Sequence, residues 1–179
     1  MQAPKRIHLF RTMFPDIPLP PQPIITRWGT WIEAAVYYAV HFDKISAFLD
    51  ALDSEEARSI SKAKITIRQP NIKNELSFIK CHFECIPAAI TKLETKNVYI
   101  GDAIRTFKTV QNNLESIPNR QEFFQKFQYV VAKNTGMTVL EKITHILEGG
   151  ELEEPNEFID GLSPAELAAI KYAPVTSCD

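Results

Sequence analysis

The chain has 179 residues and a formal net charge of −2, from 20 basic and 22 acidic residues. This near balance gives no general reason to expect nucleic-acid binding, and a hydrophobic content of 45% excludes a chain that is disordered by composition. The charge is uneven, because residues 141–179 hold nine acidic and two basic residues, whereas residues 1–140 hold 13 acidic and 18 basic ones. A mildly basic body followed by an acidic tail permits a DNA-facing surface without demanding one.

The cysteine count and the hydropathy pattern indicate a nuclear or cytoplasmic protein. Three cysteines are an odd number, in a chain long enough to bury a core without disulfides. The start of the sequence lacks the apolar run of a secretory signal, and no run of 18 apolar residues occurs. We therefore expect no membrane partner, and the length fits one domain.

Composition shifts along the chain predict four segments. Residues 1–25 form a proline-rich N-terminal arm, in which we expect no helix. Residues 26–148 form the helical domain, residues 149–162 an acidic loop, and residues 163–179 a short C-terminal helix and tail. The arm is expected to be extended because proline lacks the amide donor and fixes its backbone; its prolines include Pro15, Pro18, Pro20, Pro21 and Pro23.

The longest helical pattern covers residues 26–52. Thr26 is the predicted N-cap, because its hydroxyl can accept a hydrogen bond from a free amide of the first turn. The apolar positions then step by three and four residues, which predicts one buried stripe. This stripe consists of Trp28, Trp31, Ala35, Tyr38, Phe42, Ile45, Leu49 and Leu52.

Further helical patterns follow, and no convincing alternation of period two appears. We expect a proline kink or break near residues 83–87, where Pro87 interrupts an apolar stripe. Ser163 and Glu166 have the spacing of a capping box, with a proline between them at the first helical position. The prediction is an irregular all-α domain of about six to eight helices. After the longest one, the expected helices run from Asp53 to Ile67, from Pro70 to Leu93, and over about 101–117, 120–133, 137–148 and 164–171.

Two cysteines on one helical face raise the possibility of a zinc site. Cys81 and Cys85 are four residues apart, but a tetrahedral site needs two more ligands. Cys178 is the remaining cysteine, and the histidines show no paired spacing. The sequence therefore favours a thiol pair, and we expect no metal, no cofactor and no catalytic residue.

Arg27 and Trp28, at the head of the longest helix, allow two interpretations. In the first, Trp28 begins the buried stripe and Arg27 lies in solvent. In the second, an exposed indole stacks on an unpaired base while the guanidinium meets a phosphate. Physical reasoning alone favours the first, because Trp28 fits the period of the stripe.

Two segments of the chain resemble the helical insertion region of hAT-superfamily transposases. The first is Pro-Gln-Pro-Ile-Ile-Thr-Arg-Trp-Gly-Thr-Trp, residues 21–31, followed by Ala-Ala-Val-Tyr-Tyr at residues 34–38. The second is Lys-Tyr-Ala-Pro-Val-Thr-Ser-Cys-Asp, residues 171–179, and weaker support comes from residues 90–94 and 102–104. The resemblance implies a piece of an RNase H-like enzyme whose catalytic core is split by an all-α insertion.

The resemblance also carries expectations about activity. In the family, two catalytic aspartates precede the insertion and one glutamate follows it, and a tryptophan of the Arg-Trp motif is associated with an extruded base. By position this role falls on Trp28, with Arg27 beside it. The chain spans neither position where the carboxylates are expected, and Asp179 precedes the place of the glutamate. The resemblance therefore implies a truncated, transposon-derived fragment that does not cut DNA.

The leading hypothesis is weak binding of hairpin or transposon-end-like DNA through Arg27 and Trp28. One alternative is a helical module for protein interaction or self-association, because the regular apolar stripes suit helix–helix packing. Another is a decayed transposon remnant with no selected function.

Overall fold

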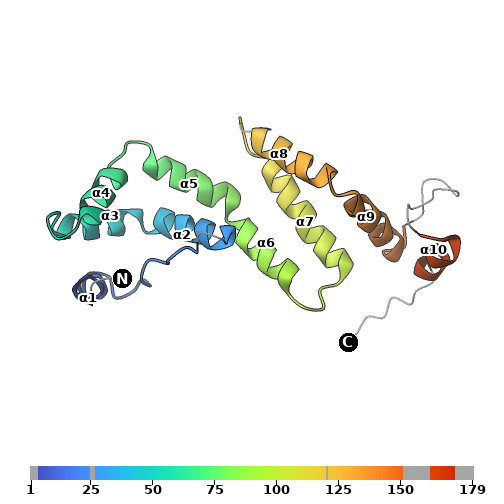
Figure 1. Cartoon of the computed structure of the whole chain (residues 1–179), viewed down its shortest axis with the longest axis horizontal. Coiled ribbons are helices and arrows are strands. Elements are labelled where there is room, and N and C mark those ends of the chain that lie inside the picture. Colours follow the sequence, from blue (N-terminus) through green and yellow to red (C-terminus); the bar gives the residue numbers. More distant parts are fainter. Residues whose placement is uncertain (1–3, 25–26, 120, 151–161, 172–179) are drawn as a thin grey trace. The chain divides into compact units, whose positions relative to one another are not determined.

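The computed structural model describes residues 4–24, 27–119, 121–150 and 162–171, and every regular element in this part of the chain is a helix (Figure 1). The all-α class is thereby confirmed. The helices are α1 (Pro4–Met13), α2 (Trp28–Val40), α3 (Phe42–Ala51), α4 (Arg58–Ile67), α5 (Ile72–Phe83), α6 (Cys85–Glu94), α7 (Ile100–Glu115), α8 (Gln121–Ala132), α9 (Thr135–Leu147) and α10 (Pro164–Lys171). None of these helices combines the length and apolar character that a bilayer span requires.

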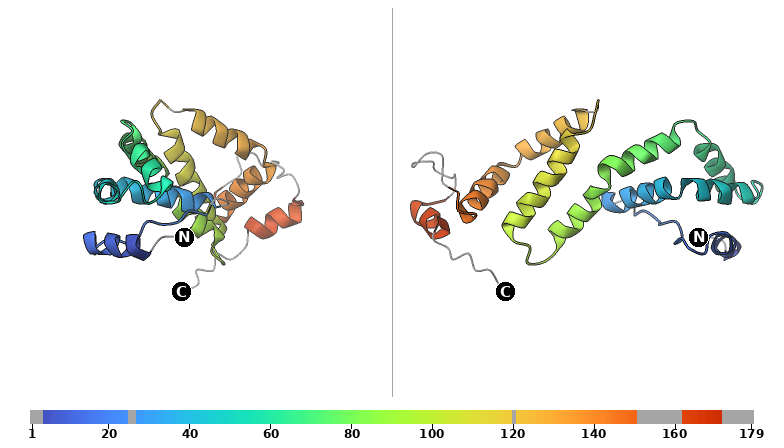
Figure 2. Two further views of the ribbon diagram at one scale, coloured as in Figure 1. Left: turned by 60° about the vertical axis from the view of Figure 1, so that its left-hand side comes forward. Right: turned by 180° about the vertical axis from the view of Figure 1, so that it is seen from behind.

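The chain divides into two compact units, whereas its length predicted one domain. Unit 1 is Met1–Ile90 and unit 2 is Thr91–Asp179, so the division falls within α6. Each unit has its own buried side chains and is described separately below. The arrangement of the helices within each unit can be followed from two further directions in Figure 2.

The core of unit 1 lies where α2 and α5 run side by side and α3 and α4 pack next to them (Figure 1). α2 contributes Ile32 and Ala35, which are 8% and 7% exposed. Because both are small or branched apolar residues, the backbones of neighbouring helices can approach closely. The other fully buried apolar residues that the structure describes in this unit are Phe10, Ala34, Ile45, Leu52 and Ile60.

The predicted helix over residues 26–52 is two helices. His41 has φ −107° and ψ 20°, so the helical backbone is interrupted between α2 and α3. The stripe is correct at Ala35, Ile45 and Leu52, which are buried. It is wrong at Trp31, which is 50% exposed because the buried face at the start of α2 is centred on Ile32 and not on its neighbour.

The N-terminal arm contains a helix, so the prediction that no helix forms over residues 1–25 is wrong. α1 ends at Met13, before the prolines begin at Pro15. Pro4 is its first residue, where the missing amide proton would have no helical partner in any case. Phe10 on this helix is only 1% exposed, and its ring packs edge-on at 5.0 Å from Phe48 of α3.

The proline-rich segment after α1 is fastened to α2. The hydroxyl of Tyr37 donates a hydrogen bond of 2.6 Å to the carbonyl oxygen of Pro18. Burial, together with the neighbouring Tyr38, raises the pKa of Tyr37, so its hydroxyl stays a donor over the physiological range. The segment is therefore held against the C-terminal half of α2.

Two helix starts lie later than the sequence predicted. The side chain of Asp53 accepts a 2.9 Å bond from the amide of Glu55 and forms a turn, so α4 begins at Arg58. α5 begins at Ile72, after a turn that contains Pro70. Such local side-chain bonds compete with helical hydrogen bonds, which explains the shift at Asp53.

The predicted break near residues 83–87 is confirmed. α5 ends at Phe83 and α6 begins at Cys85, with Glu84 in a turn between them. Pro87 is the third residue of α6 and is buried. Its missing amide donor is not needed there, because the first-turn amides of a helix have no partner within the helix.

Unit 2 is built on α7, which packs against α8 and α9 (Figure 1). The rings of Phe107 on α7 and Phe127 on α8 lie 5.2 Å apart. The fully buried apolar residues among those described in this unit are Ile104, Leu114, Ile117 and Ile146. Among the described residues, unit 2 therefore has fewer buried apolar side chains than unit 1.

The ends of the last two helices follow the sequence predictions. α9 is closed at Gly149, which has φ 88°, and the amide of Gly150 donates a 2.9 Å bond to the carbonyl oxygen of His145. At α10, the amide of Ser163 donates a 2.7 Å bond to Glu166, and the amide of Glu166 donates a 3.3 Å bond to the hydroxyl of Ser163. The predicted capping box is thus present. Most of the predicted acidic loop, residues 151–161, lies outside the described residues.

Candidate nucleic-acid interface

Arg27 occupies the N-cap position of α2. Its backbone is extended, with φ −123° and ψ 97°, and its side chain makes no capping hydrogen bond. The residue is exposed, as the first interpretation of the sequence expected. Thr26, the predicted N-cap, lies outside the described residues, and so does the side chain of Trp28, the first residue of α2.

Thr30 fixes the backbone that presents Arg27. Its hydroxyl accepts a 2.9 Å bond from the amide of Ile24 and donates a 2.8 Å bond to the carbonyl oxygen of Arg27. The amide of Arg27 in turn donates a 2.8 Å bond to the carbonyl oxygen of Ile24. These bonds close the turn at the head of α2. Sequence reasoning missed Thr30, although a threonine in the first turn of a predicted helix is a plausible local hydrogen-bonding residue.

The first turn of α2 also lies close to the first turn of α6. A Cβ atom added at Gly29 would lie 3.9 Å from both Cα and Cβ of Pro87, so the two backbones approach closely at this point. Pro87 is buried in the first turn of α6. Both residues belong to unit 1. Arg27 therefore lies in a turn that Ile24 and Thr30 hold by hydrogen bonds. The next helical turn packs against Pro87.

Trp31 supplies an exposed aromatic ring one helical turn after Arg27. It is 50% exposed, although the sequence predicted that it is a core residue. Arg27 itself precedes the helix and has an extended backbone, so the helical spacing of four residues does not determine how its side chain lies relative to the indole. Ile24, just before the turn, is likewise 50% exposed. Arg27 and Trp31 are thus both exposed and lie four residues apart in the sequence, while the side chain of Trp28 lies outside the described residues.

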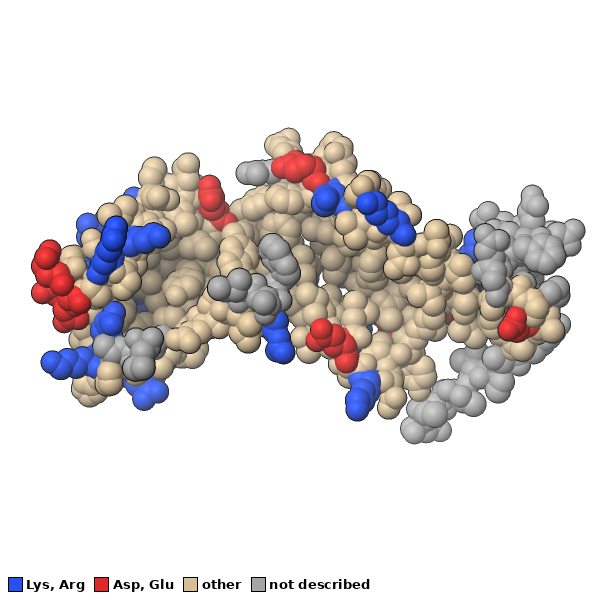
Figure 3. Space-filling model, viewed as in Figure 1, with Lys and Arg blue, Asp and Glu red and all other residues tan. Residues whose placement is uncertain are grey.

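The charge of Arg27 is not neutralised by an ion pair among the described residues. Within the described residues, the ion pairs of unit 1 are Arg68–Asp50 at 2.6 Å and Lys73–Asp43 at 2.8 Å. Figure 3 shows how the Lys and Arg side chains of the chain are mixed with acidic ones. An unpaired guanidinium can bind a phosphate, and an exposed indole can stack on an unpaired base.

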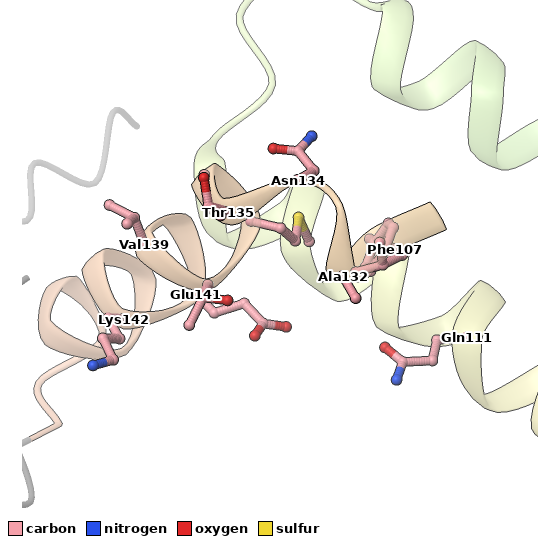
Figure 4. Close-up of a pocket in the computed structure, with 12 residues that line it drawn as sticks. Phe107, Gln111, Ala132, Asn134, Thr135, Val139, Glu141 and Lys142 are labelled. Atoms are coloured by element: carbon pink, nitrogen blue, oxygen red, sulfur yellow. The ribbon is translucent and has the colours of Figure 1, made fainter. Parts of the chain in front are cut away.

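A hollow in unit 2 offers no comparable chemistry. It has a volume of about 800 Å³ and lies between α7, α8 and α9 (Figure 4). Phe107 and Gln111 come from α7, and Glu141 of α9 is paired with Lys108 at 3.7 Å. None of the twelve lining residues is a histidine, cysteine or serine.

The cysteine pair stays a pair of thiols within the described residues. Cys81 is exposed and Cys85 is half-buried, and neither forms a disulfide. The described part of the chain has no group of three or more His, Cys, Asp or Glu residues placed to hold a metal ion. Cys178 lies outside the described residues.

Comparisons of the chain with protein-family models, with curated proteins and with solved structures found no match. The similarity to hAT transposases therefore rests on the quoted segments alone.

Proposed function

We propose that this chain is a non-catalytic helical region derived from a hAT-like transposase, and that it binds DNA weakly through the head of α2. The observation that carries the DNA contact is the exposed pair formed by Arg27 and Trp31. The motif in residues 21–31 supports the transposase origin, because it resembles the Arg-Trp segment of the family at this place.

Each residue has a distinct part in the proposed contact. The guanidinium of Arg27 binds a phosphate oxygen, which gives an affinity that falls with salt. The half-exposed indole of Trp31 stacks on an unpaired base, such as one in a hairpin loop or beside a nick. Trp28 is included through the resemblance alone. The proposal that the chain does not cleave DNA likewise depends on the resemblance, which places the catalytic carboxylates outside the sequence.

The test is titration of fluorescein-labelled hairpin DNA with the intact chain, followed by anisotropy at several salt concentrations. Because each phosphate contact contributes about 0.7 to 0.9 to the slope of log K against log salt, Arg27→Ala should lower that slope by about one contact. Trp31→Ala should weaken hairpin binding by about 5-fold or more and leave the slope unchanged, because stacking releases no counterions.

Arg58→Ala is the matched control, since Arg58 is also an exposed arginine at the start of a helix of unit 1. It should leave both the affinity and the slope near the values of the parent chain. Equal slopes for Arg27→Ala and Arg58→Ala would contradict the phosphate contact, and binding without salt dependence would remove the electrostatic basis of the proposal.

A further inference from the structure

An exposed tyrosine on α8 lies between two lysines. Tyr129 is 55% exposed, and the next residue, Val130, is 56% exposed. The ammonium of Lys133 is 4.2 Å from the centre of the Tyr129 ring, and that of Lys126 is 5.4 Å from it. These three side chains, Lys126, Tyr129 and Lys133, are called the α8 patch below.

The surroundings of the α8 patch favour an anionic partner. Residues 123–140 contain two lysines and no acidic residue. The nearest acidic residue on α8 is Glu122, one turn before Lys126, and Glu141 on α9 is paired with Lys108. Figure 3 shows Lys and Arg side chains over α8. The ion pairs given for the described residues of unit 2 join Arg105 to Asp102 and Glu148 and Lys108 to Glu141, and they include neither Lys126 nor Lys133.

The spacing of the patch suits a nucleic-acid strand better than an isolated anion. The two lysines are seven residues apart, which places them about 10 Å apart along the helix axis. Long lysine side chains at this separation can reach different phosphates of one strand. The half-exposed ring of Tyr129 between them can stack on a nucleic-acid base. An acidic peptide has no base to stack there.

We propose that the α8 patch is a second nucleic-acid contact, which takes single-stranded DNA or RNA by stacking one unpaired base on Tyr129 while Lys126 and Lys133 bind phosphates. The residues belong to unit 2, whereas the head of α2 belongs to unit 1. The inference shares the class of ligand with the proposed function but uses none of its residues. Either one can fail while the other stands.

The experiment measures binding of the intact chain to fluorescein-labelled oligo(dT) by anisotropy over a range of salt. Tyr129→Leu keeps an apolar side chain but removes the ring, and it should weaken binding by at least about 5-fold without changing the salt slope. Tyr129→Phe keeps the ring and should bind like the parent. The double variant Lys126→Ala and Lys133→Ala should lower the slope by about 1.4, or 0.7 for each lost phosphate contact.

Matched controls separate this patch from general charge effects. The double variant Lys92→Ala and Lys96→Ala removes two exposed lysines of unit 2 outside the patch and should leave the slope unchanged. Polyglutamate of the same length as the oligonucleotide is the second probe. Binding of polyglutamate that is weakened equally by Tyr129→Leu would overturn the inference in favour of an acidic protein partner.

The outcomes distinguish the two proposals. Oligo(dT) binding that depends on Tyr129 but not on Arg27 supports the α8 patch and contradicts the head of α2 as the main contact for unpaired bases. Dependence on Arg27 with Tyr129→Leu unchanged overturns the α8 patch alone. Parent-like binding by both variants overturns both contacts.

Discussion

Two aromatic residues of unit 1 have opposite environments. Phe10 is 1% exposed and packs against Phe14 and Phe48, with ring centres 5.7 and 5.0 Å away. Trp31 is 50% exposed and contributes its ring to the surface. The first residue therefore stabilises the fold, and the second is available for binding.

This contrast predicts unequal costs of truncation. Phe10→Ala should lower the free energy of unfolding by about 3–5 kcal/mol, because it removes a buried ring and leaves a cavity. Trp31→Ala should cost about 1 kcal/mol or less, since half of its surface already contacts water. Urea denaturation of both variants measures the difference. A Phe10→Ala variant as stable as the parent would show that α1 does not dock on α3 in solution.

The two rings also show what a stripe of apolar residues can and cannot predict. The period of the apolar stripe determines which residues share a helix face, and Ala35 and Ile45 are buried as predicted. The period does not determine which part of that face another helix or segment covers. At the start of α2 the cover is the segment around Pro87, which contacts Gly29. That contact is distant in the sequence, so no pattern within α2 predicts that Trp31 stays exposed.

Two helix ends follow directly from the sequence. The capping box at α10 and the glycine closure of α9 follow from short motifs whose hydrogen bonds are local. The missed helix α1 and the break at His41 differ in kind. The prolines of residues 15–23 do not exclude a helix before them, and a regular apolar stripe does not require one uninterrupted helix.

The capping box makes α10 sensitive to acid. Hydrogen bonds from the hydroxyl and amide of Ser163 lower the pKa of Glu166 below its ordinary value of 4.5. A carboxylate with a depressed pKa stabilises the helix above the unfolded pKa, and this contribution is lost as pH falls through the lower folded value. The helical content of α10 should therefore decrease as the pH falls below 4.5 and through the lower folded pKa of Glu166.

Carbon chemical shifts of residues 164–171, followed by NMR between pH 6 and pH 3, measure this change. Glu166→Gln is the control, because its amide cannot ionise and its helix should show a flat profile over the same range. A profile in the parent as flat as that of the variant would mean that the capping box does not act on α10.

At the scale of the whole molecule, two units predict two unfolding transitions. The described residues of unit 1 include seven buried apolar side chains besides Pro87, and those of unit 2 include four, so unit 2 should melt first. Calorimetry of the intact chain should resolve both steps. Ile146→Ala should lower the first transition and Ile45→Ala the second, and a single transition shifted by both variants would contradict independent units.

The division into units was not predictable from composition. Residues 26–148 read as one run of helical patterns, and the boundary falls within α6, where neither glycine nor a charge run marks a linker. The candidate site was predictable in part. The Arg-Trp segment pointed to the head of α2, but the role of Thr30 and the exposure of Trp31 depend on contacts made by Ile24 and by neighbouring elements.

The emission of the two tryptophans tests the central claim most directly. Trp28 and Trp31 are the tryptophans of the chain, and both lie in the first turns of α2, so their fluorescence reports on this site alone. Addition of hairpin DNA should quench the emission, and both salt and Arg27→Ala should reduce the quenching. Binding of the same DNA, seen by anisotropy, with unchanged tryptophan emission would contradict a contact at the head of α2.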